Sequence, residues 1–489
     1  MKLTDLLGCL SFYETKVPLD SIEVAAIAID SRKVEKGSLF VCLKGFAADG
    51  HAYAGEAAEN GAAAIIAQKP IETELPLIIV PDTGRALAML SAAFYQNPTA
   101  ELPLIGVTGT NGKTTVTYLL EKIFQENRKK TGVLGTIQMK IRSDVYPVAN
   151  TTPDALFLQK SFRSMLDAGV EQAVMEVSSH ALDLGRVYGC DFDIAVFTNL
   201  SRDHLDYHED MKEYLHAKSL LFSQLGNTYE DSSKKFAVLN ADDPAGQYLI
   251  KKTSQQVITY GLQETALVRA EETRMTQDGS SFRLVTPAGA VPVSTKLVGK
   301  FNIYNMLAAS AAALAAGVSL EVIKTALKGM TGVNGRFEPV AKGQPYQVLV
   351  DYAHTPDSLE NVLQTILEFA TGNVYVVAGC GGDRDRSKRP LMAAMAVKYA
   401  DFAIFTSDNP RTEDPQHILN DMTKGLSETN YQTVADRKTA IRMAIDLAEE
   451  DDVVLIAGKG HETYQQIGDE KVEFDDRQTA AEAIKEKEK

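Results

Sequence analysis

The sequence lacks the features that would place the protein in a membrane or in an oxidising compartment. No apolar run approaches the length that spans a bilayer. The N-terminus, Met1–Asp5, has neither the apolar core nor the small-residue cleavage site of a signal peptide. The four cysteines are scattered without the spacing of a metal or redox site. We therefore expect a cytoplasmic protein with reduced thiols and no membrane insertion.

A basic charge balance is also absent. The formal net charge of the 489 residues is -15, whereas proteins that bind nucleic acid need basic patches to meet its phosphates. We therefore expect no nucleic-acid partner. Any anion that the protein binds must be held by individual Arg and Lys side chains, by backbone N–H groups or by metal. The chain is too long for one core, so we expect about two to four domains.

The clearest motif is a glycine-rich turn between a predicted strand and a predicted helix. The apolar run 104–107 is typical of a buried strand, and apolar residues at helical spacing follow over 116–124. A turn in this place surrounds phosphate with backbone N–H groups and the N-terminus of a helix. The turn itself consists of Gly109, Thr110, Asn111, Gly112, Lys113, Thr114 and Thr115.

Two side chains of this turn have predicted roles. Lys113 would reach the outer phosphates of a nucleotide, and the Thr114 hydroxyl would ligate Mg²⁺. Val107 stands where the general phosphate-loop pattern has its first glycine, so we expect a variant turn. A flexible loop that merely contains Gly-Lys-Thr is the alternative. The flanking strand and helix favour nucleotide binding.

The residues before the turn predict a small α/β unit. Strands are expected over 25–29, 39–43, 63–67 and 77–80, with a helix over 53–60. Ser31, between Asp30 and Arg32, lies just beyond the first of these strands, where ligands are commonly bound. A solvated turn explains this tripeptide equally well.

The second predicted unit carries polar residues at its strand ends. Strands are expected over 172–177, 194–198, 236–240 and 257–260, which with intervening helices imply a mainly parallel sheet with helices on both faces. Short antiparallel strands are expected over 262–298, and an Ala-rich helix follows 299–305.

Three side chains of this unit are candidates for chemistry. Glu176 ends a predicted strand, where a second Mg²⁺ ligand of a phosphate-loop protein usually stands. A buried Glu satisfied by other groups is the alternative. His204 lies among polar residues past the next strand, and Lys218 lies on a predicted helix over 211–225. Taken alone, Lys218 would be a solvated lysine.

Residues after about 332 predict a third unit with a site of its own. Expected strands at 348–350, 374–379, 403–406 and 453–458 each run into a polar or glycine-containing loop. Ligands of open α/β sheets bind at such carboxyl ends. Arg384 and Arg411 offer partners for carboxylates, and Glu462 offers one for an amine. An amino acid is therefore the expected ligand of this site.

These segments together resemble the Mur ligase family over essentially the whole chain. The resemblance rests on 109–115, 176–180, 199–204, 299–305, 351–356 and 408–411. It implies three α/β domains: a UDP-substrate-binding unit (1–99), a central phosphate-loop ATP-binding unit (100–331) and a C-terminal Rossmann-like amino-acid-binding unit (332–489).

The resemblance also implies an activity in peptidoglycan precursor synthesis. ATP would phosphorylate the γ-carboxylate of D-glutamate in a UDP-N-acetylmuramoyl-dipeptide, and the amine of an incoming amino acid would attack the acyl phosphate. Mg²⁺, in about two copies, would screen the charge. The Asp-Asn-Pro-Arg form of the loop at 408–411 resembles the members that add meso-2,6-diaminopimelate. Arg411 would bind the distal carboxylate, which lysine lacks. We expect a monomer.

The resemblance assigns roles residue by residue. Lys218 resembles the family's carbamylated lysine, formed with CO₂, which would support Mg²⁺ together with Thr114, Glu176 and His204. Besides the phosphate loop, the implied ATP contacts are Asn302, Arg336 and Asp351. The implied UDP-substrate contacts are Ser31, Asn150, Thr151, Thr152, Ser178 and Arg186. The implied diaminopimelate pocket consists of Arg384, Asp408, Asn409, Pro410, Arg411, Gly458 and Glu462.

Two alternatives remain at this stage. Another amide ligase of the same architecture, such as a folylpolyglutamate synthetase, would need a folate pocket in place of the unit around Ser31. An ATP-driven switch without ligase chemistry would keep Lys113 but need no amine pocket. Release of ADP that depends on both a UDP-muramoyl-dipeptide and diaminopimelate separates the three.

Overall fold

The computed structural model describes residues 1–45, 48–229, 235–276 and 279–488. Contacts within the chain divide it into two compact units. The first unit contains Met1–Gly106, Lys129–Ala195 and Leu220–Lys235, and the second contains Val107–Arg128, Val196–Ser219 and Phe236–Lys489. Within the described residues, every helix is too short or too polar to span a bilayer.

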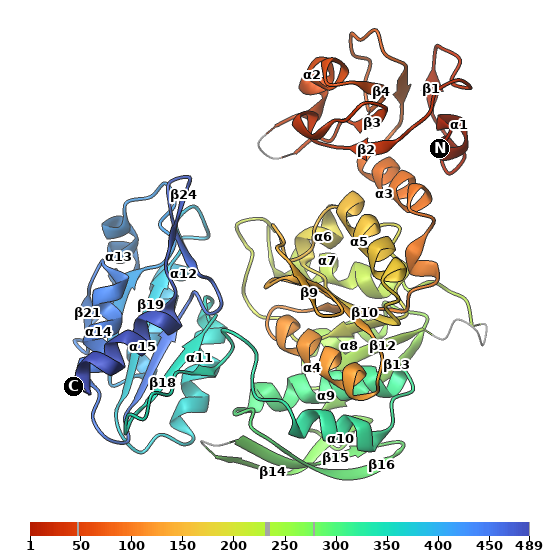
Figure 1. The fold of residues 1–489 in the computed structure, drawn as a ribbon. Helices are drawn as coiled ribbons and strands as arrows, with labels where there is room; N and C mark the ends of the chain where they lie inside the picture. Colours follow the sequence, from red (N-terminus) through yellow and green to blue (C-terminus); the bar gives the residue numbers. More distant parts are fainter. Residues whose placement is uncertain (46–47, 230–234, 277–278, 489) are drawn as a thin grey trace. The chain divides into compact units, whose positions relative to one another are not determined.

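The N-terminal part of the first unit is a small α/β fold (Figure 1, red). Its described strands form a sheet in the order β1-β5-β4-β3-β2, parallel except for β1. Ile65 packs in one apolar cluster and its neighbour Ile66 in another, because successive side chains of a strand point to opposite faces. The elements are α1 (Leu3–Leu7), β1 (Glu14–Thr15), β2 (Ala26–Ala28), β3 (Ser38–Val41), α2 (Ala54–Glu59), β4 (Ala62–Ala67), β5 (Leu77–Ile79) and α3 (Thr83–Phe94).

The rest of the first unit supplies further strands and helices. β10 pairs parallel with β7, and β7, β8 and β9 form an antiparallel meander. β6 crosses from the first unit into the second and ends at the glycine-rich turn. The elements are β6 (Leu104–Thr108), β7 (Thr131–Leu134), β8 (Met139–Ile141), β9 (Asp144–Tyr146), α5 (Ala155–Asp167), β10 (Gln172–Glu176), α6 (Ser179–Asp183) and β11 (Ile194–Phe197).

The second unit begins with the helices that follow the turn. α9 is buried along most of its length, because its alanines allow close packing. β12, β13 and β14 pair parallel, and β14, β15 and β16 pair antiparallel, as predicted for 262–298. The elements are α4 (Lys113–Glu126), α7 (Met211–Ser223), β12 (Phe236–Asn240), α8 (Pro244–Ile250), β13 (Gln256–Gly261), β14 (Val268–Thr276), β15 (Gly279–Thr286), β16 (Gly289–Thr295), α9 (Lys300–Ala315) and α10 (Leu320–Lys328).

The C-terminal part of the second unit is a doubly wound sheet (Figure 1, blue). Its described strands have the order β17-β18-β22-β19-β20-β21, all parallel except β17. The elements are β17 (Glu338–Pro339), β18 (Gln347–Asp351), α11 (Pro356–Leu367), β19 (Val374–Cys380), α12 (Lys388–Tyr399), β20 (Phe402–Ser407), α13 (Pro415–Thr423), β21 (Tyr431–Thr433), α14 (Arg437–Leu447), β22 (Val453–Ala457), β23 (Tyr464–Ile467), β24 (Glu470–Glu473) and α15 (Asp476–Lys487).

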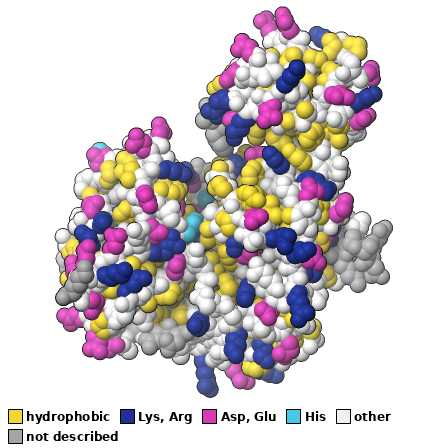
Figure 2. All heavy atoms as spheres, viewed as in Figure 1, with side chains coloured by type: hydrophobic (Ala, Val, Ile, Leu, Met, Phe, Trp, Pro, Cys, Tyr) yellow, Lys and Arg dark blue, Asp and Glu magenta, His cyan; other side chains and the backbone are white. Residues whose placement is uncertain are grey.

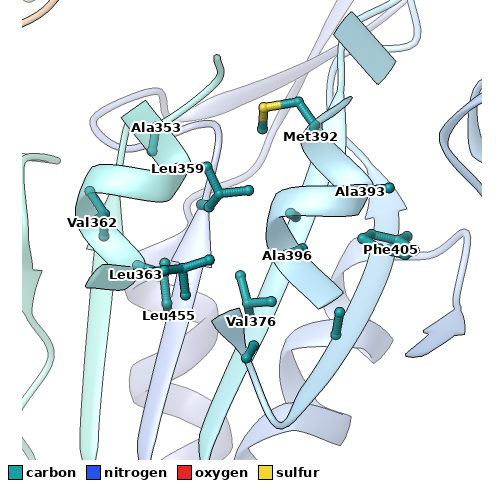
Figure 3. Close-up of a cluster of buried hydrophobic side chains, with 14 of the residues drawn as sticks. Ala353, Leu359, Val362, Leu363, Val376, Met392, Ala393, Ala396, Phe405 and Leu455 are labelled. Carbon is teal, nitrogen blue, oxygen red and sulfur yellow. The ribbon is translucent and has the colours of Figure 1, made fainter. Parts of the chain in front are cut away.

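Both faces of this sheet are covered by helices. Leu455 of β22 packs with α11 and α12 in one cluster, as Figure 3 shows, whereas Val454 and Ile456 pack with α14 and α15 in another. Burying such a side chain stabilises the fold by about 1.5–3 kcal/mol. A strand that is apolar at every position is therefore expected, and this explains why the run 453–458 was recognisable.

The surface carries side chains of both charge signs. On the face drawn in Figure 2, Lys and Arg side chains are interspersed with Asp and Glu. The predicted α/β class and the predicted strands of all three segments are confirmed. The predicted domain boundaries remain predictions.

Candidate functional site

The glycine-rich turn has a backbone that only glycine adopts at two positions. Gly109 has φ 145°, and a Cβ there would stand 1.8 Å from Thr198 Oγ1. Gly112 has φ 87° at the N-cap of α4, and a Cβ there would stand 2.3 Å from Asn305 Oδ1. Val107 lies inside β6 with ordinary strand geometry and is fully buried. The turn is thus a variant in which the required glycines are Gly109 and Gly112.

The segment after β11 holds this turn through hydrogen bonds. The backbone N–H of Thr110 donates to Asn199 O (2.9 Å), and that of Asn111 donates to Asn199 Oδ1 (2.9 Å). Thr198 Oγ1 donates to Asn111 O (2.6 Å), and Ser201 N donates to Thr110 Oγ1 (3.0 Å). These neutral bonds fix the turn from one side.

Two lysines donate to the same carbonyl of the turn. Lys113 Nζ lies 2.9 Å from Gly109 O, and Lys218 Nζ lies 2.8 Å from it. Lys218 is almost fully buried and lies over the ring of Tyr214. Burial and the nearby charge of Lys113 hold the pKa of Lys218 well below its usual range, against the opposite effect of Asp203. A neutral amine is a nucleophile, which is what addition to CO₂ requires.

One of the predicted ATP contacts, Arg336, touches the glycine-rich turn. Arg336 Nη2 donates to Thr114 Oγ1 (3.0 Å), and its guanidinium stands 4.4 Å from the ring centre of Tyr352. Asp351 accepts from Phe337 N (2.7 Å), and burial raises the pKa of its carboxyl. Asn302 is buried on α9, where its amide donates to Val298 O. The structure therefore brings Arg336 and Thr114 into direct contact.

His204 occupies a left-handed backbone position with φ 54°. Its backbone N–H donates to Asp203 Oδ1 (2.9 Å), and its Nε2 lies 3.4 Å from Asp203 Oδ2. Burial raises the pKa of Asp203, but the nearby His204, His354 and Lys388 outweigh it and lower that pKa to about 2. Asp203 is therefore an anion that orients His204, and the sequence reasoning gave it no role.

The predicted substrate residues of the first unit form a network at the end of β10. Glu176 is almost fully buried and accepts from the backbone N–H and the hydroxyl of Thr136 (both 2.9 Å). Because Thr136 gives its one hydroxyl proton to Glu176, Thr151 is the donor in their 3.1 Å contact. The carboxyl oxygens of Glu176 are of the kind that Mg²⁺ prefers.

Thr152 connects this network to α6. Its hydroxyl donates to Glu176 O (2.9 Å) and accepts from Ser178 N (3.0 Å), and its carbonyl accepts from Arg186 (3.0 Å). Ser178 caps α6 by accepting from Ala181 N. Thr151, Thr152, Ser178 and Arg186 are thus neighbours, and their contacts with a UDP-substrate remain predictions.

Two further predicted substrate contacts of the first unit are placed differently. Ser31 begins a short 3₁₀ helix after β2 and donates to Glu56 Oε2 (2.7 Å). Asn150 is exposed in the loop before α5. Ser31 is therefore buried beside Glu56, whereas Asn150 is exposed to solvent.

No cluster of three or more His, Cys, Asp or Glu side chains within the described residues is arranged to hold a metal ion. Thr114, His204 and Lys218 belong to the second unit, whereas Glu176 belongs to the first. The hydroxyl of Thr114 and the carboxylate of Glu176 are oxygen ligands of the kind that Mg²⁺ prefers. The predicted metal set therefore remains a prediction.

The loop after β20 is held by hydrogen bonds between Asn409 and the segment that follows β22. Asn409 Oδ1 accepts from Lys459 Nζ and from Gln466 N (both 2.9 Å), while Asn409 Nδ2 donates to Glu462 Oε2 (2.9 Å). Burial raises the pKa of the neighbouring Asp408, but the charges of Lys459 and Arg437 outweigh it and lower that pKa. This loop therefore presents fixed carboxylates.

Arg411 leaves this loop in a left-handed conformation with φ 52°. Its backbone bonds with Gln466 and Gly468 hold it against β23, and its Nη1 donates to Gly382 O (2.7 Å). Arg384 is exposed on the loop after β19, and its Nη1 donates to Asp383 O. Two guanidinium groups thus come from adjacent strand ends, as expected for binding carboxylates.

Gly458 and Pro410 complete the predicted pocket. Gly458 has φ 114°, and a Cβ there would stand 2.7 Å from Asp408 Oδ2. Pro410 O accepts from Glu413 N (3.0 Å), which closes the turn after the loop. A side chain at Gly458 would therefore displace the Asp408 carboxylate.

Sequence reasoning missed the residues that support the pocket. Arg437 and Asp476 form a fully buried ion pair at 2.7 Å, and Arg437 Nη2 also donates to Ala457 O (3.0 Å). Gln465 Nε2 donates to Asp408 O (2.7 Å) from β23. No local pattern indicates these roles, because tertiary contacts alone bury these side chains.

The comparisons with known proteins agree with this geometry. Family models match residues 23–95 (Mur ligase family, catalytic domain), 107–313 (Mur ligase middle domain) and 335–460 (Mur ligase, glutamate ligase domain). A curated protein of Oceanobacillus iheyensis is 58% identical over 491 residues, covers 100% of both chains and is named UDP-N-acetylmuramoyl-L-alanyl-D-glutamate–2,6-diaminopimelate ligase.

Several solved structures resemble the chain. One, titled as a structure of UDP-N-acetylmuramoyl-L-alanyl-D-glutamate–2,6-diaminopimelate ligase, is 35% identical with a TM-score of 0.71 and covers 100% of both chains. A folylpolyglutamate synthase of Mycobacterium tuberculosis is 17% identical with a TM-score of 0.62 and covers 77% of this chain and 92% of its own. The second likeness shows a shared fold only.

Proposed function

The chain belongs to the Mur ligase family, and from this premise we propose that it uses ATP to add meso-2,6-diaminopimelate to UDP-N-acetylmuramoyl-L-alanyl-D-glutamate. The product is a peptidoglycan precursor. One observation carries the proposal: the second unit contains both a phosphate loop with two lysines on one carbonyl and a loop whose carboxylates and guanidinium groups suit a zwitterion. The relative from Oceanobacillus iheyensis supports the choice of substrates.

The proposed reaction has two steps. A γ-carboxylate oxygen of the substrate's D-glutamate attacks the γ-phosphorus of ATP, which forms an acyl phosphate and releases ADP. The amine of diaminopimelate then attacks the acyl carbon, loses a proton, and phosphate leaves as the amide forms. The first step makes the carboxylate electrophilic, since phosphate is a much better leaving group than oxide.

The phosphate loop binds and orients ATP in this proposal. Backbone N–H groups of Gly109–Thr115 surround the phosphates, and Lys113 moves its ammonium from Gly109 O to the outer phosphate oxygens. Arg336 stays beside Thr114 and faces the same phosphates, while Asn302 and Asp351 contact the nucleoside. Mg²⁺, when bound, screens the repulsion between the carboxylate and ATP.

Lys218 has a proposed role beyond its ammonium. Its lowered pKa favours the neutral amine, and addition of that amine to CO₂ releases a proton and leaves an anionic carbamate. An anion on this buried side chain fits Mg²⁺ together with Thr114, Glu176 and His204. The carbamate also places a negative charge near the ammonium of Lys113.

The two substrates have separate proposed sites. Ser31, Asn150, Thr151, Thr152, Ser178 and Arg186 bind the UDP-muramoyl-dipeptide. For diaminopimelate, Asp408, Asn409, Glu462 and Gly458 surround an ammonium, while Arg384, Pro410 and Arg411 form the side that binds carboxylates. We assign UDP-substrate binding to segment 1–99, ATP binding to segment 100–331 and amino-acid binding to segment 332–489. We also propose that the protein is a cytoplasmic monomer, and sedimentation tests its oligomeric state.

The deciding experiment measures ADP release with each substrate omitted in turn. We expect release to require the UDP-muramoyl-dipeptide and diaminopimelate together, and to be weak with lysine in place of diaminopimelate. Release that responds to a folate substrate but not to the UDP-sugar would indicate a folylpolyglutamate synthetase. Release that needs no amino acid would indicate an ATP-driven switch.

A further inference from the structure

Lys459 is a lysine with no exposed side-chain surface. Its Nζ donates to Asn409 Oδ1 (2.9 Å) and to Glu462 Oε2 (3.0 Å), and it stands 5.5 Å from the ring centre of Tyr464. A buried ammonium is costly unless oxygen acceptors surround it. Because no part of this side chain reaches solvent, a ligand that enters the pocket meets the partners of Lys459 and not Lys459 itself.

The position of Lys459 determines which way the Asn409 amide faces. Asn409 Oδ1 receives two donors, Lys459 Nζ and Gln466 N, while Asn409 Nδ2 donates to Glu462. A rotated amide would place its NH₂ group against an ammonium and a backbone N–H, with no acceptor for either. The ammonium therefore selects one of the two amide orientations.

Lys459 also fixes the direction of the Glu462 carboxylate. Within the part of the chain that the structure describes, hydrogen bonds to Glu462 reach Oε2 only, from Lys459 and Asn409. The second oxygen, Oε1, receives none of these bonds, so we take it as the acceptor for a ligand ammonium. The charge of Lys459 further keeps the neighbouring Asp408 ionised, together with that of Arg437.

The geometry points to Lys459 as a positioning residue for the incoming amino acid. It orients the Asn409 amide and the Glu462 carboxylate for a ligand ammonium without touching the ligand. This inference rests on the proposed function, since it concerns the pocket for diaminopimelate. It adds a residue whose effect is confined to amino-acid binding and leaves ATP and the UDP-substrate unaffected.

The test replaces the ammonium by a side chain of similar length. Lys459→Met keeps the apolar stem and removes the charge and the donors. We expect KM for diaminopimelate to rise about 10- to 100-fold, because misplacement of binding groups by about 1 Å has effects of this size. The value of kcat and the Kd values for ATP and the UDP-substrate should change by less than about threefold.

A control and a double-mutant cycle make the result specific. Lys398→Met, at an exposed lysine of α12, should leave KM unchanged. In a Glu462→Gln background, Lys459→Met should raise KM by less than about threefold, because coupled residues are not additive. A fall in kcat with unchanged KM, or full additivity in the cycle, would overturn the inference.

A second measurement needs no variant and keeps the inference testable if Lys459→Met does not fold. In a crystal structure with diaminopimelate bound, Lys459 should keep both bonds, and no ligand atom should approach its Nζ within hydrogen-bond distance. A direct bond from Nζ to the ligand would overturn the inference. If the wild-type enzyme turns over diaminopimelate while Lys459→Met behaves like wild type, only the inference fails. If the wild type shows no such turnover, the proposed function fails and the inference with it.

Discussion

The phosphate loop and the loop of Asp408–Arg411 lie in the same unit but are held by different forces. Neutral groups of Thr198, Asn199 and Ser201 hold the phosphate loop. The other loop is held by Lys459 and Glu462, and the turn behind it by the pair of Arg389 and Glu413. The lysines of the phosphate loop donate only to its backbone carbonyls among the bonds described above, whereas in the other loop Lys459 pairs with the carboxylate of Glu462.

The largest expected effect on kcat is at Lys218, beside the phosphate loop. Lys218→Ala removes the buried amine beside Gly109 O, so kcat should fall at least about 100-fold, while ATP binding changes much less. Small carboxylic acids should restore part of the activity by replacing the carbamate. Steady-state kinetics and ATP titration measure both effects.

The matched control for this variant is Lys212→Ala, at an exposed lysine of the same helix α7. It should keep wild-type kinetics. Full activity of Lys218→Ala would rule out the carbamate role.

The second prediction tests the shape of the phosphate loop. Gly109→Ala forces a Cβ to within 1.8 Å of Thr198 Oγ1 at a φ that alanine avoids. Strain of about 1–3 kcal/mol corresponds to ATP binding that is about 10- to 100-fold weaker, which calorimetry measures. Gly55→Ala, in α2 with nothing within 4 Å, should leave ATP binding unchanged. Equal affinity in both variants would contradict the predicted phosphate site.

The third prediction concerns the charged loop. Arg411→Ala should reduce the preference for diaminopimelate over lysine by about 10-fold or more, because one charged hydrogen bond is worth about 1.5–3 kcal/mol. Competition between the two amino acids in the ADP-release assay measures the preference. Arg283→Ala, at a half-exposed arginine of β15, is the control. An unchanged preference would show that another group recognises the distal carboxylate.

The smallest expected effect is on thermal stability, and it depends on pH because the ion pair behind the charged loop contains a carboxylate. The hydrogen bond from Arg389 lowers the pKa of Glu413 to about 2, from 4.5 in the unfolded chain. A lowered folded-state pKa means that this stabilisation is present above pH 4.5 and is lost as the pH falls toward 2. Glu413→Gln should therefore lower Tm by a few degrees at neutral pH and by progressively less below pH 4.5.

Thermal unfolding measured over this pH range checks the prediction, with exposed Glu450→Gln as the control. A difference between wild type and Glu413→Gln that stays constant down to pH 2 would show that the ion pair is not responsible.

The strands were predictable for a physical reason that does not extend to the pocket. Runs such as 194–198 and 453–458 are apolar because every residue of β11 and β22 is buried, so burial is visible in the sequence itself. The hairpin of β23 and β24 escaped prediction, because Tyr464–Ile467 and Glu470–Glu473 are mostly polar and half-exposed or exposed.

Some residues of the candidate site were likewise predictable from the sequence, and others were not. The positions of Lys113, Arg411 and Glu462 follow from strand ends and glycine turns, which local sequence specifies. The supporting roles of Lys459 and Arg437 do not, because a buried lysine or arginine looks like a solvated one until the fold surrounds it. Their roles depend on partners far away in the chain.

The hairpin has a consequence for the order in which the protein becomes functional during synthesis. Thr198, Asn199, Ser201 and Lys218, which hold one side of the phosphate loop, are all in the chain once residue 218 has been added. The loop with Arg411 still lacks its bonds to Gln465, Gln466 and Gly468, which lie beyond residue 460, where the family model ends. A growing chain therefore contains the residues that shape one side of its phosphate loop long before it contains those that hold Arg411.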